Sequence, residues 1–336
     1  MTKTDTYRDA GGRGTPDANV RVVFPTTYQV YFSGAEMSQS VTHAMTVDVE
    51  DYFHVAAFFD VIQPQDWDRW PSRVVPNTDR LLELFDNAGL KATFFILGWV
   101  AEREPDLVKR IHAAGHEVAS HGYSHQFIYR QSPEVFHEET RRSKRILEDL
   151  IQAPVNGYRA ASYSITRRSL WALDSLAELG FTWDSSIFPT RHDNYGIPGS
   201  PEEPYKIITR SGAELTEFPL TTAKVLGQSV PAAGGGYFRQ YPYALSRWLF
   251  RRASDNGRKP QIFYLHPWEI DPEQPRIPDA SRFSRFRHYT NLHRCMPRLE
   301  RMISDFPFGT ISQSLGSVNL SYTLDLRDAQ WSAETS

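Results

Sequence analysis

The segments AMTVDV (residues 44–49) and NTDRLLELFDNAGLKATFFIL (residues 77–97) show the pattern that decides the fold. The first predicts a buried β-strand. The second predicts a helix with leucines and a phenylalanine on one face and a stop at Gly89, followed by a second buried strand, ATFFIL. A strand, a helix and another strand in this order are typical of α/β proteins with parallel sheets.

The same alternation continues along the chain. Further helices are predicted at 105–115, 132–151, 167–180, 242–257 and 292–306, and further strands at 116–120, 156–162, 181–186, 215–220, 261–266 and 308–313. Ser132 and Pro133 are expected at the N-cap and first position of the longest helix. About seven βα units result. The irregular segments HDNYGIPGSPEEP, VPAAGGGYFRQYP and the proline-rich stretch before Arg282 are expected to form the substrate face.

Composition limits the class of protein. The chain has 336 residues, 40% of them hydrophobic, which suits a single α/β barrel domain. Its formal charge of −3 and pI near 6.4 do not indicate a nucleic acid partner or an anionic membrane surface, so binding to a polyanion would need a local patch. The single cysteine, Cys295, excludes an intrachain disulfide framework and a multi-cysteine zinc site.

The termini and the location are further expectations. Residues 1–36 lack the basic start and apolar run of a secretory signal and are expected to be a disordered extension before Met37. The barrel is expected over 37–320, including a C-terminal segment from about 200, with 321–336 as a tail. No apolar run is long enough for a transmembrane helix. We therefore expect a soluble, cytoplasmic protein, although export by a route without an N-terminal signal stays open.

The chemistry is concentrated in two motifs, TVDVED (46–51) and SHGYSH (120–125). On a helical turn, the spacing of His121 and His125 would present both imidazoles to one side, as two ligands of one metal ion. In a regular strand Asp48 and Glu50 would face the same way, so one carboxylate can bind the metal while the other handles protons. Surface histidines and a solvated acidic turn are the alternative interpretation.

Polar residues also follow several of the predicted strands. Asp48, His121, Arg159, Asp184 and His266 each fall at or just beyond the carboxyl end of a strand. In an α/β barrel these ends meet at one rim, where active sites are found. Metal-assisted hydrolysis is therefore the leading hypothesis.

Five motifs in this order resemble those of the polysaccharide deacetylases, carbohydrate esterase family four, which share the nodulation-deacetylase (NodB) homology domain. They are TVDVED, SHGYSH, GYRAASYSI, FTWDSSIFP and IFYLHPWE. The resemblance covers residues 43 to about 312 and implies a distorted (β/α)7 barrel. It is closest to a subgroup from bacterial exopolysaccharide and exosortase (PEP-CTERM) gene clusters, which carries a DUF3473-like C-terminal segment resembling AAGGGYFRQYP.

The resemblance also implies roles for the residues. The catalytic set would be Asp48 as base, His266 as general acid, Arg159 as the group that orients the base and Asp184 as the group that holds the imidazolium. The metal ligands would be Glu50, His121 and His125, with Asp51 as the alternative carboxylate, because Val49 interrupts the usual pair of adjacent aspartates. Substrate contacts would come from Tyr163, Tyr237, Phe238, Arg239 and Trp268, with Gly234, Gly235 and Gly236 close by. A packed glycine-rich turn is the alternative for residues 234–239.

The implied reaction is removal of N-acetyl groups from amino sugars of a polysaccharide or its precursor. Metal-bound water would be the nucleophile, and a backbone N–H near Tyr163 would help to hold the oxyanion. The ion is expected to be Zn²⁺, with Co²⁺, Ni²⁺ and Mn²⁺ as alternatives. Hydrolysis of a cyclic amide or imide and inactive carbohydrate binding are the other hypotheses. The sequence does not define the polysaccharide, the native metal or the oligomeric state.

Overall fold

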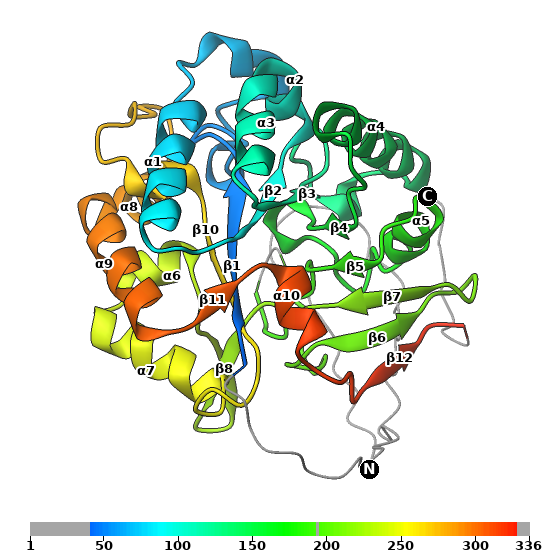
Figure 1. Ribbon diagram of the computed structural model, residues 1–336. Helices are drawn as coiled ribbons and strands as arrows, with labels where there is room; N and C mark the ends of the chain where they lie inside the picture. Colours follow the sequence, from blue (N-terminus) through cyan, green and yellow to red (C-terminus); the bar gives the residue numbers. More distant parts are fainter. Residues whose placement is uncertain (1–40, 193–194, 328–336) are drawn as a thin grey trace, which may run out of the picture.

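The structure, a computed structural model, describes residues 41–192 and 195–327. The expectation for residues 1–36 lies outside this part of the chain. The main sheet has ten strands, nine of them in the order β10-β1-β2-β3-β4-β5-β7-β6-β12, while β11 also pairs with β1. Helices pack around this curved sheet (Figure 1).

Parallel strands make up most of the sheet. In the described residues, seven neighbouring strands run parallel to one another, namely β1 (His43–Val49), β2 (Thr93–Ile96), β3 (Glu117–Ser120), β4 (Gly157–Tyr158), β5 (Trp183–Asp184), β7 (Glu214–Glu217) and β10 (Ile262–Leu265). These seven strands, with their helices, confirm the predicted distorted (β/α)7 barrel. β10 and β7 are the first and last of these seven strands and do not pair with each other, so the barrel is open between them. Just beyond β7, the Thr221 hydroxyl donates to the Ile262 carbonyl at 2.8 Å and accepts from the Ile262 N–H at 2.9 Å, which joins the two sides through a side chain.

The burial of the central strand β1 explains why its sequence predicts a strand of a parallel sheet. All seven of its residues are buried, as expected for a parallel strand covered on both faces. Its register aligns Val47 with Phe94 on one side and with Leu265 on the other. The strand therefore lies in the hydrophobic core, and its carboxyl end points toward the loops that carry the polar motifs.

Helices connect and cover the strands. They are α1 (Val74–Asn87), α2 (Gly98–Arg103), α3 (Pro105–Ala113), α4 (Pro133–Ile151), α5 (Ala172–Glu178), α6 (Gly235–Gln240), α7 (Tyr243–Ala253), α8 (Arg282–Tyr289), α9 (Leu292–Asp305) and α10 (Ile311–Gly316). Short 3-10 turns are η1 (Ala56–Phe58), η2 (Pro64–Arg69), η3 (Ile128–Arg130), η4 (Ala161–Tyr163) and η5 (Pro267–Ile270). The Ser132 hydroxyl accepts from the Val135 N–H at 3.3 Å, which confirms the N-cap predicted for the longest helix.

Three predictions for the C-terminal half were wrong. The strand expected over 308–313 ends after β11 (Phe308–Gly309), because Thr310 and Gln313 form a capping box that starts α10. The segment expected to be irregular, residues 230–242, begins with the end of β9 (Gln228–Pro231), which forms a hairpin with β8 (Thr222–Val225), and also contains α6. The expected tail from 321 contains β12 (Thr323–Asp325), which pairs with β6 (Tyr205–Ile208).

Glycine permits one close approach between strands. A Cβ on Gly157 in β4 would lie 1.9 Å from the ring of Trp183 in β5. The indole therefore packs directly over the β4 backbone, beneath the loop that begins with Arg159. Any larger residue would displace this ring and the loop above it.

Candidate metal centre and active site

Three ligand atoms converge beyond the carboxyl ends of β1 and β3. Glu50 follows β1, His121 follows β3, and His125 lies in the next loop; their ligand atoms are all within 4.8 Å of one another, and all three side chains are buried. The Glu50 Oε2 atom is 2.5 Å from His125 Nε2. Apart from this ion pair, Glu50 Oε2 and His125 Nδ1 have no hydrogen-bond partner among the residues that the structure describes. Two imidazoles, a carboxylate and unpartnered buried atoms fit a divalent metal ion.

The spacing of the two histidines had suggested a helical turn. The backbone around them is not helical. Gly122 and His125 take left-handed conformations, with φ of 73° and 52°, and the turn between them brings the two imidazole centroids to 5.4 Å. His121 Nδ1 is 2.9 Å from the Arg159 carbonyl oxygen, which can only accept a hydrogen bond. Nδ1 therefore carries the proton, and Nε2 is the nitrogen with a lone pair for a metal.

Charges at the centre favour this ligand set. Burial lowers the pKa of His121 to about 4, so the imidazole is neutral at physiological pH. Burial alone would raise the pKa of Glu50, but the surrounding histidines hold it below its ordinary value. A neutral imidazole and an ionised carboxylate are the states that bind metal.

Asp51, the alternative ligand, lies elsewhere. Its carboxylate accepts hydrogen bonds from the backbone N–H groups of Arg73 at 2.7 Å and Val74 at 3.0 Å, and from the Ser72 hydroxyl at 2.8 Å. Asp51 thus satisfies free donors at the start of α1. The structure places Glu50, not Asp51, with the two histidines.

The first candidate catalytic group is Asp48, which is held by a buried arginine. Arg159 Nη1 donates to Asp48 Oδ1 at 2.7 Å, and the Tyr163 hydroxyl donates to Asp48 Oδ2 at 3.2 Å. Burial raises the pKa of Asp48, but Arg159, His121 and His266 bring it below the ordinary value. Asp48 is therefore ionised and able to accept a proton.

Arg159 is itself fixed on every side. Its Nε donates to the Ser185 carbonyl at 3.1 Å, its Nη2 to the Ser185 hydroxyl at 2.9 Å and its Nη1 to the Thr46 hydroxyl at 2.9 Å. Its guanidinium lies over the ring of Phe95, 3.9 Å from the centroid. The sequence pointed to Arg159 but not to these partners, which come from three separate strands or strand ends.

The second candidate catalytic group is His266, at the end of β10. Its Nε2 is 3.5 Å from Glu50 Oε1 and 3.8 Å from Asp48 Oδ2, so it faces the same space as both carboxylates. Burial lowers the pKa of His266, but the carboxylates of Glu50, Glu269 and Asp48 raise it by more than burial lowers it. The resulting pKa is about 9. The imidazole is therefore protonated at neutral pH and able to donate a proton.

The carboxylate that holds this imidazole is Glu269, and the role implied for Asp184 was wrong. His266 Nδ1 donates to Glu269 Oε1 at 2.7 Å. Asp184 instead accepts from the Ser186 hydroxyl at 2.6 Å and forms a buried carboxyl pair with Glu217. Ser186 also accepts from the Ala160 N–H, at 2.8 Å, so Asp184 supports the Arg159 loop and not His266.

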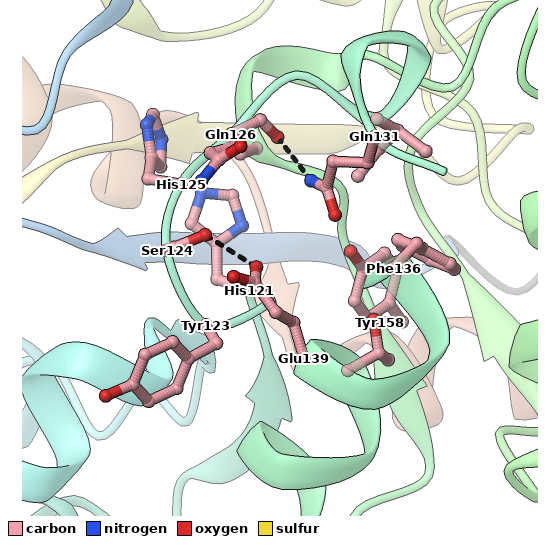
Figure 2. Close-up of a pocket in the computed structure, with 13 residues that line it drawn as sticks. His121, Tyr123, Ser124, His125, Gln126, Gln131, Phe136, Glu139 and Tyr158 are labelled. Atoms are coloured by element: carbon pink, nitrogen blue, oxygen red, sulfur yellow. Dashed lines mark hydrogen bonds between the residues drawn. The ribbon is translucent and has the colours of Figure 1, made fainter. Parts of the chain in front are cut away.

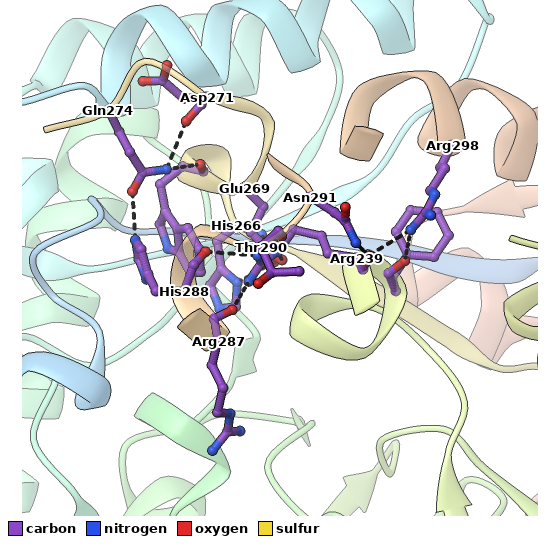
Figure 3. A network of polar contacts seen from close by, with 12 residues as sticks. Arg239, His266, Glu269, Asp271, Gln274, Arg287, His288, Thr290, Asn291 and Arg298 are labelled. Atoms are coloured by element: carbon purple, nitrogen blue, oxygen red, sulfur yellow. Dashed lines mark hydrogen bonds and ion pairs between the residues drawn. The ribbon is translucent and has the colours of Figure 1, made fainter. Parts of the chain in front are cut away.

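Two further residues expected at the substrate lie behind the site. Arg239 is buried, and its Nε donates to Glu269 Oε2 at 2.6 Å (Figure 3). Trp268 is only 5% exposed, and its Nε1 donates to Glu50 Oε1 at 3.3 Å. The indole stacks on His266 and His288, at 5.2 and 4.2 Å between centroids, so it has no free face for a sugar. Arg239 therefore supports Glu269, and Trp268 supports Glu50.

The rest of segment 234–239 is largely packed. Phe238 lies in the core, 4.8 Å from the ring of Phe263. Gly234 has φ 83°, and a Cβ there would lie 1.9 Å from the Tyr264 carbonyl oxygen, so this turn requires glycine. Tyr237 is partly exposed, and its hydroxyl is hydrogen-bonded to that of Tyr195. Tyr237 therefore remains the member of this segment available to a substrate.

A small cavity adjoins the histidine loop (Figure 2). The Ser124 hydroxyl donates to Glu139 at 2.5 Å, and Gln131 Nε2 donates to the Gln126 carbonyl at 3.3 Å. These contacts tie the loop to α4 and to the segment before it. They fix the position of His125, which the short turn alone would leave adjustable.

Sequence reasoning missed Glu269, which has the most direct role of the residues not foreseen. A signal was present in HPWE: Glu269 is three residues after His266, the spacing of a capping box, and its Oε1 also accepts from the His266 N–H at 3.2 Å. Its partner Arg239 lies 30 residues away, so no local pattern connects the two.

The fold is a distorted (β/α) barrel, and these residues form a candidate metal centre at one rim of it. Residues 54–182 match the polysaccharide deacetylase family, and residues 185–316 match a family described as a domain of unknown function, DUF3473. The chain therefore contains a polysaccharide deacetylase domain followed by a DUF3473 domain. The two residues of β5 separate the two matches.

Named relatives are similar over part of their length. A chitooligosaccharide deacetylase from Bradyrhizobium is 30% identical over 100 residues, which are 30% of this chain and 43% of that protein. A peptidoglycan deacetylase from Helicobacter pylori is 32% identical over 108 residues, 32% of this chain and 36% of that protein. The chain thus spans less than half of the length of these curated relatives.

Solved structures show the same fold. A Mycobacterium smegmatis protein assigned to the polysaccharide deacetylases has a TM-score of 0.55 at 18% identity, covering 87% of this chain and 98% of its own. An allantoinase has a TM-score of 0.51 at 15% identity, covering 82% and 89%. These likenesses establish the barrel and do not distinguish among its reactions.

Proposed function

We propose that this protein is a metal-dependent hydrolase that removes N-acetyl groups from amino sugars of a polysaccharide or its precursor. The observation that carries the proposal is the convergence of three groups of side chains at one rim. They are the ligand set Glu50, His121 and His125, the base Asp48 and the acid His266. The names of the deacetylase relatives support an N-acetylated saccharide as substrate.

The ligand set fits a divalent metal, for which Zn²⁺ is our first expectation and Co²⁺, Ni²⁺ and Mn²⁺ are alternatives. Such an ion supplies Lewis acidity that polarises the amide carbonyl and lowers the pKa of water. Glu50 contributes the negative charge of the set. Trp268, which donates to Glu50 Oε1, orients this carboxylate so that Oε2 faces His125.

Proton transfer is assigned to Asp48 and His266. Asp48 accepts the proton of the attacking water, and Arg159 holds the carboxylate in position through Oδ1. His266 then donates its Nε2 proton to the departing amine nitrogen, so the products are acetate and a free amino sugar. Glu269 fixes the imidazole through Nδ1 and leaves Nε2 directed at the site.

Metal content and acetate release test the proposal together. We would measure divalent metal by elemental analysis, and acetate release from N-acetylated chitooligosaccharides, for the wild type and for the His121→Ala/His125→Ala variant. We expect about one metal per chain and acetate release in the wild type, and neither in the variant. The matched control is His112→Ala/His293→Ala, which removes two exposed histidines and should retain both properties.

The other outcomes separate the competing functions. Hydrolysis of allantoin or hydantoin without acetate release would replace the deacetylase by a cyclic amide hydrolase. Oligosaccharide binding without hydrolysis of either substrate would indicate an inactive carbohydrate-binding protein. Activity that persists in the metal-free double variant would contradict the proposed ligand set.

A further inference from the structure

Helix α8 exposes two aromatic side chains that its own fold does not use. Phe283 and Phe286 are 68% and 65% exposed, while His288 on the same helix is buried. The two phenylalanines are three residues apart, so they lie on the same side of the helix. Large apolar side chains exposed together in this way mark a contact surface.

Arginines surround these aromatics. The α8 patch, as we define it, consists of Arg282, Phe283, Arg285, Phe286 and Arg287. The run from residue 280 to residue 299 contains five arginines and no aspartate or glutamate, although the chain as a whole carries a charge of −3. The patch therefore supplies the local basic surface that the overall charge did not indicate, and its electrostatic complement is an anionic surface.

The patch is attached to the active site. On the buried side of α8, His288 stacks on Trp268, which donates to Glu50. Arg239, the partner of Glu269, donates to the backbone carbonyls of His288 at 2.8 Å and Thr290 at 2.7 Å (Figure 3). Phe58 in η1, beyond the carboxyl end of β1, packs on His288 at 4.7 Å between centroids. The helix thus lies at the catalytic end of the barrel.

We propose that the α8 patch docks this protein onto an anionic lipid bilayer. Phe283 and Phe286 enter the boundary between headgroups and acyl chains, and the arginines contact lipid phosphates. No helix in the described residues is long and apolar enough to cross a membrane, so the contact is interfacial. Phenylalanine offers no hydrogen-bonding group, which favours a lipid surface over a polar protein partner.

Docking of this kind specifies the substrate class. Because α8 adjoins the catalytic rim, an enzyme held at the bilayer through this helix presents its site to saccharides anchored in the same bilayer. We therefore assign the substrate to the lipid-linked N-acetylated saccharides. This assignment rests on the proposed deacetylase function, whereas the docking itself does not.

Vesicle binding tests the docking. Purified full-length protein is sedimented with vesicles of phosphatidylcholine alone or phosphatidylcholine mixed with phosphatidylglycerol. The wild type is expected to bind the mixed vesicles, with an affinity that falls as salt is raised. Arg282→Gln/Arg285→Gln should bind about 30-fold more weakly, from about 1 kcal/mol per basic residue at the surface. The affinity of Phe283→Ser/Phe286→Ser for the mixed vesicles should be at least about 10-fold lower than that of the wild type.

Matched controls exclude general effects of charge and apolar exposure. Arg145→Gln/Arg251→Gln removes the same charge from α4 and α7, and Leu226→Ser removes a side chain that is 99% exposed in the turn between β8 and β9. Both controls should bind vesicles as the wild type does. All of these variants change exposed or partly exposed side chains and should keep the wild-type melting temperature and acetate release from a soluble oligosaccharide.

The remaining results decide between occupants. A wild type that ignores mixed vesicles, or patch variants that bind like wild type, would overturn the docking. A wild-type dimer that becomes monomeric in Phe283→Ser/Phe286→Ser would also overturn it. Binding of the wild type to a single-stranded oligonucleotide but not to vesicles would do the same. Loss of vesicle binding in the patch variants supports docking even if no protein releases acetate. In that case only the deacetylase function and the substrate assignment fail.

Discussion

Arg239 and Glu269 form a buried ion pair, with 2.6 Å between Nε and Oε2, and the second carboxylate oxygen holds His266 Nδ1 at 2.7 Å. Both side chains are at most 2% exposed. Burial raises the pKa of Glu269, but Arg239 and His266 keep it below its ordinary value. All three residues lie in the segment that matches DUF3473, so this segment supplies the proposed acid and its support, while the segment that matches the polysaccharide deacetylases contains the two histidines of the candidate metal site.

Replacing Glu269 should disable the acid while leaving the metal ligands in place. In Glu269→Gln the amide lacks the negative charge that favours the imidazolium, and we expect kcat for acetate release to fall by about 10²-fold. Metal content should remain at the wild-type level. The matched control is Glu202→Gln, which breaks an ion pair with Lys224 on the surface and should leave kcat unchanged. Equal loss of metal and activity in Glu269→Gln would show a merely structural role.

The adjacent acids Glu50 and Asp51 should separate under mutation. Glu50→Gln is expected to lose metal, because the amide carries no charge. Asp51→Asn should retain the metal but reduce the free energy of unfolding by about 1–2 kcal/mol, because Asp51 binds the donors at the start of α1. Elemental analysis and denaturant unfolding of both variants check this. Metal loss in Asp51→Asn together with retention in Glu50→Gln would reverse the assignment.

The sequence predicted the parts of the site that depend on strand ends. Asp48 is the penultimate residue of β1, whereas His121, Arg159 and His266 directly follow β3, β4 and β10, and parallel strands place their carboxyl ends at one edge. The pattern therefore predicts one rim at which these residues meet. It could not choose between Glu50 and Asp51, because β1 ends at Val49 and the turn beyond it does not follow strand alternation.

The sequence did not predict the contacts between side chains of distant segments. Arg239 was expected to contact the substrate because AAGGGYFRQYP resembles a family-specific segment, yet its side chain is buried against Glu269. Trp268 looked like a sugar platform, but its two ring contacts come from His266 and from His288 of α8, a helix that the sequence reading did not identify. Asp184 lies in β5, but its carboxyl group contacts Ser186 and Glu217 and not His266, the partner that the resemblance had implied for it.

The Asp184 and Glu217 pair should reduce stability at higher pH. Burial raises the pKa of Asp184 to about 6, and burial and Asp184 raise that of Glu217 well above its ordinary value. The native state then keeps a proton that the unfolded state releases, so the free energy of unfolding decreases as pH rises above the unfolded-state pKa values.

Glu217→Gln should remove this penalty. Its amide can still accept from the Ile187 N–H, which now donates to Glu217 Oε1 at 2.9 Å, and can donate to Asp184. We expect stability at pH 8 to rise by about 1 kcal/mol or more, with a flatter pH dependence. Glu214→Gln on the same strand, an exposed partner of Lys206, is the control and should show neither change. A less stable Glu217→Gln protein at pH 8 would contradict the shared proton.

His43 should have the opposite effect, on the acid side. Burial lowers its pKa from 6.5 to about 4, and its ring packs against Phe250 and Phe306 while Nδ1 accepts from the Gln261 N–H at 3.2 Å. Between pH 4 and 6.5 the unfolded state binds a proton at His43 that the native state does not bind. The stabilising contribution of neutral His43 to the free energy of unfolding is therefore complete above pH 6.5. As pH falls to 4 it is lost, at about 3 kcal/mol.

The measurement is the free energy of unfolding of His43→Asn between pH 4 and 7. The asparagine oxygen can replace Nδ1 as acceptor, so the variant keeps the hydrogen bond but cannot be protonated. It should be less stable at pH 7, because its smaller side chain fills the phenylalanine pocket poorly, and should lose less stability on acidification than the wild type. His116, whose pKa burial likewise lowers to about 4, leaves part of the acid sensitivity in place. His293→Asn, at an exposed position, should keep the wild-type slope. A slope in His43→Asn equal to that of His293→Asn would show that His43 is protonated equally in both states.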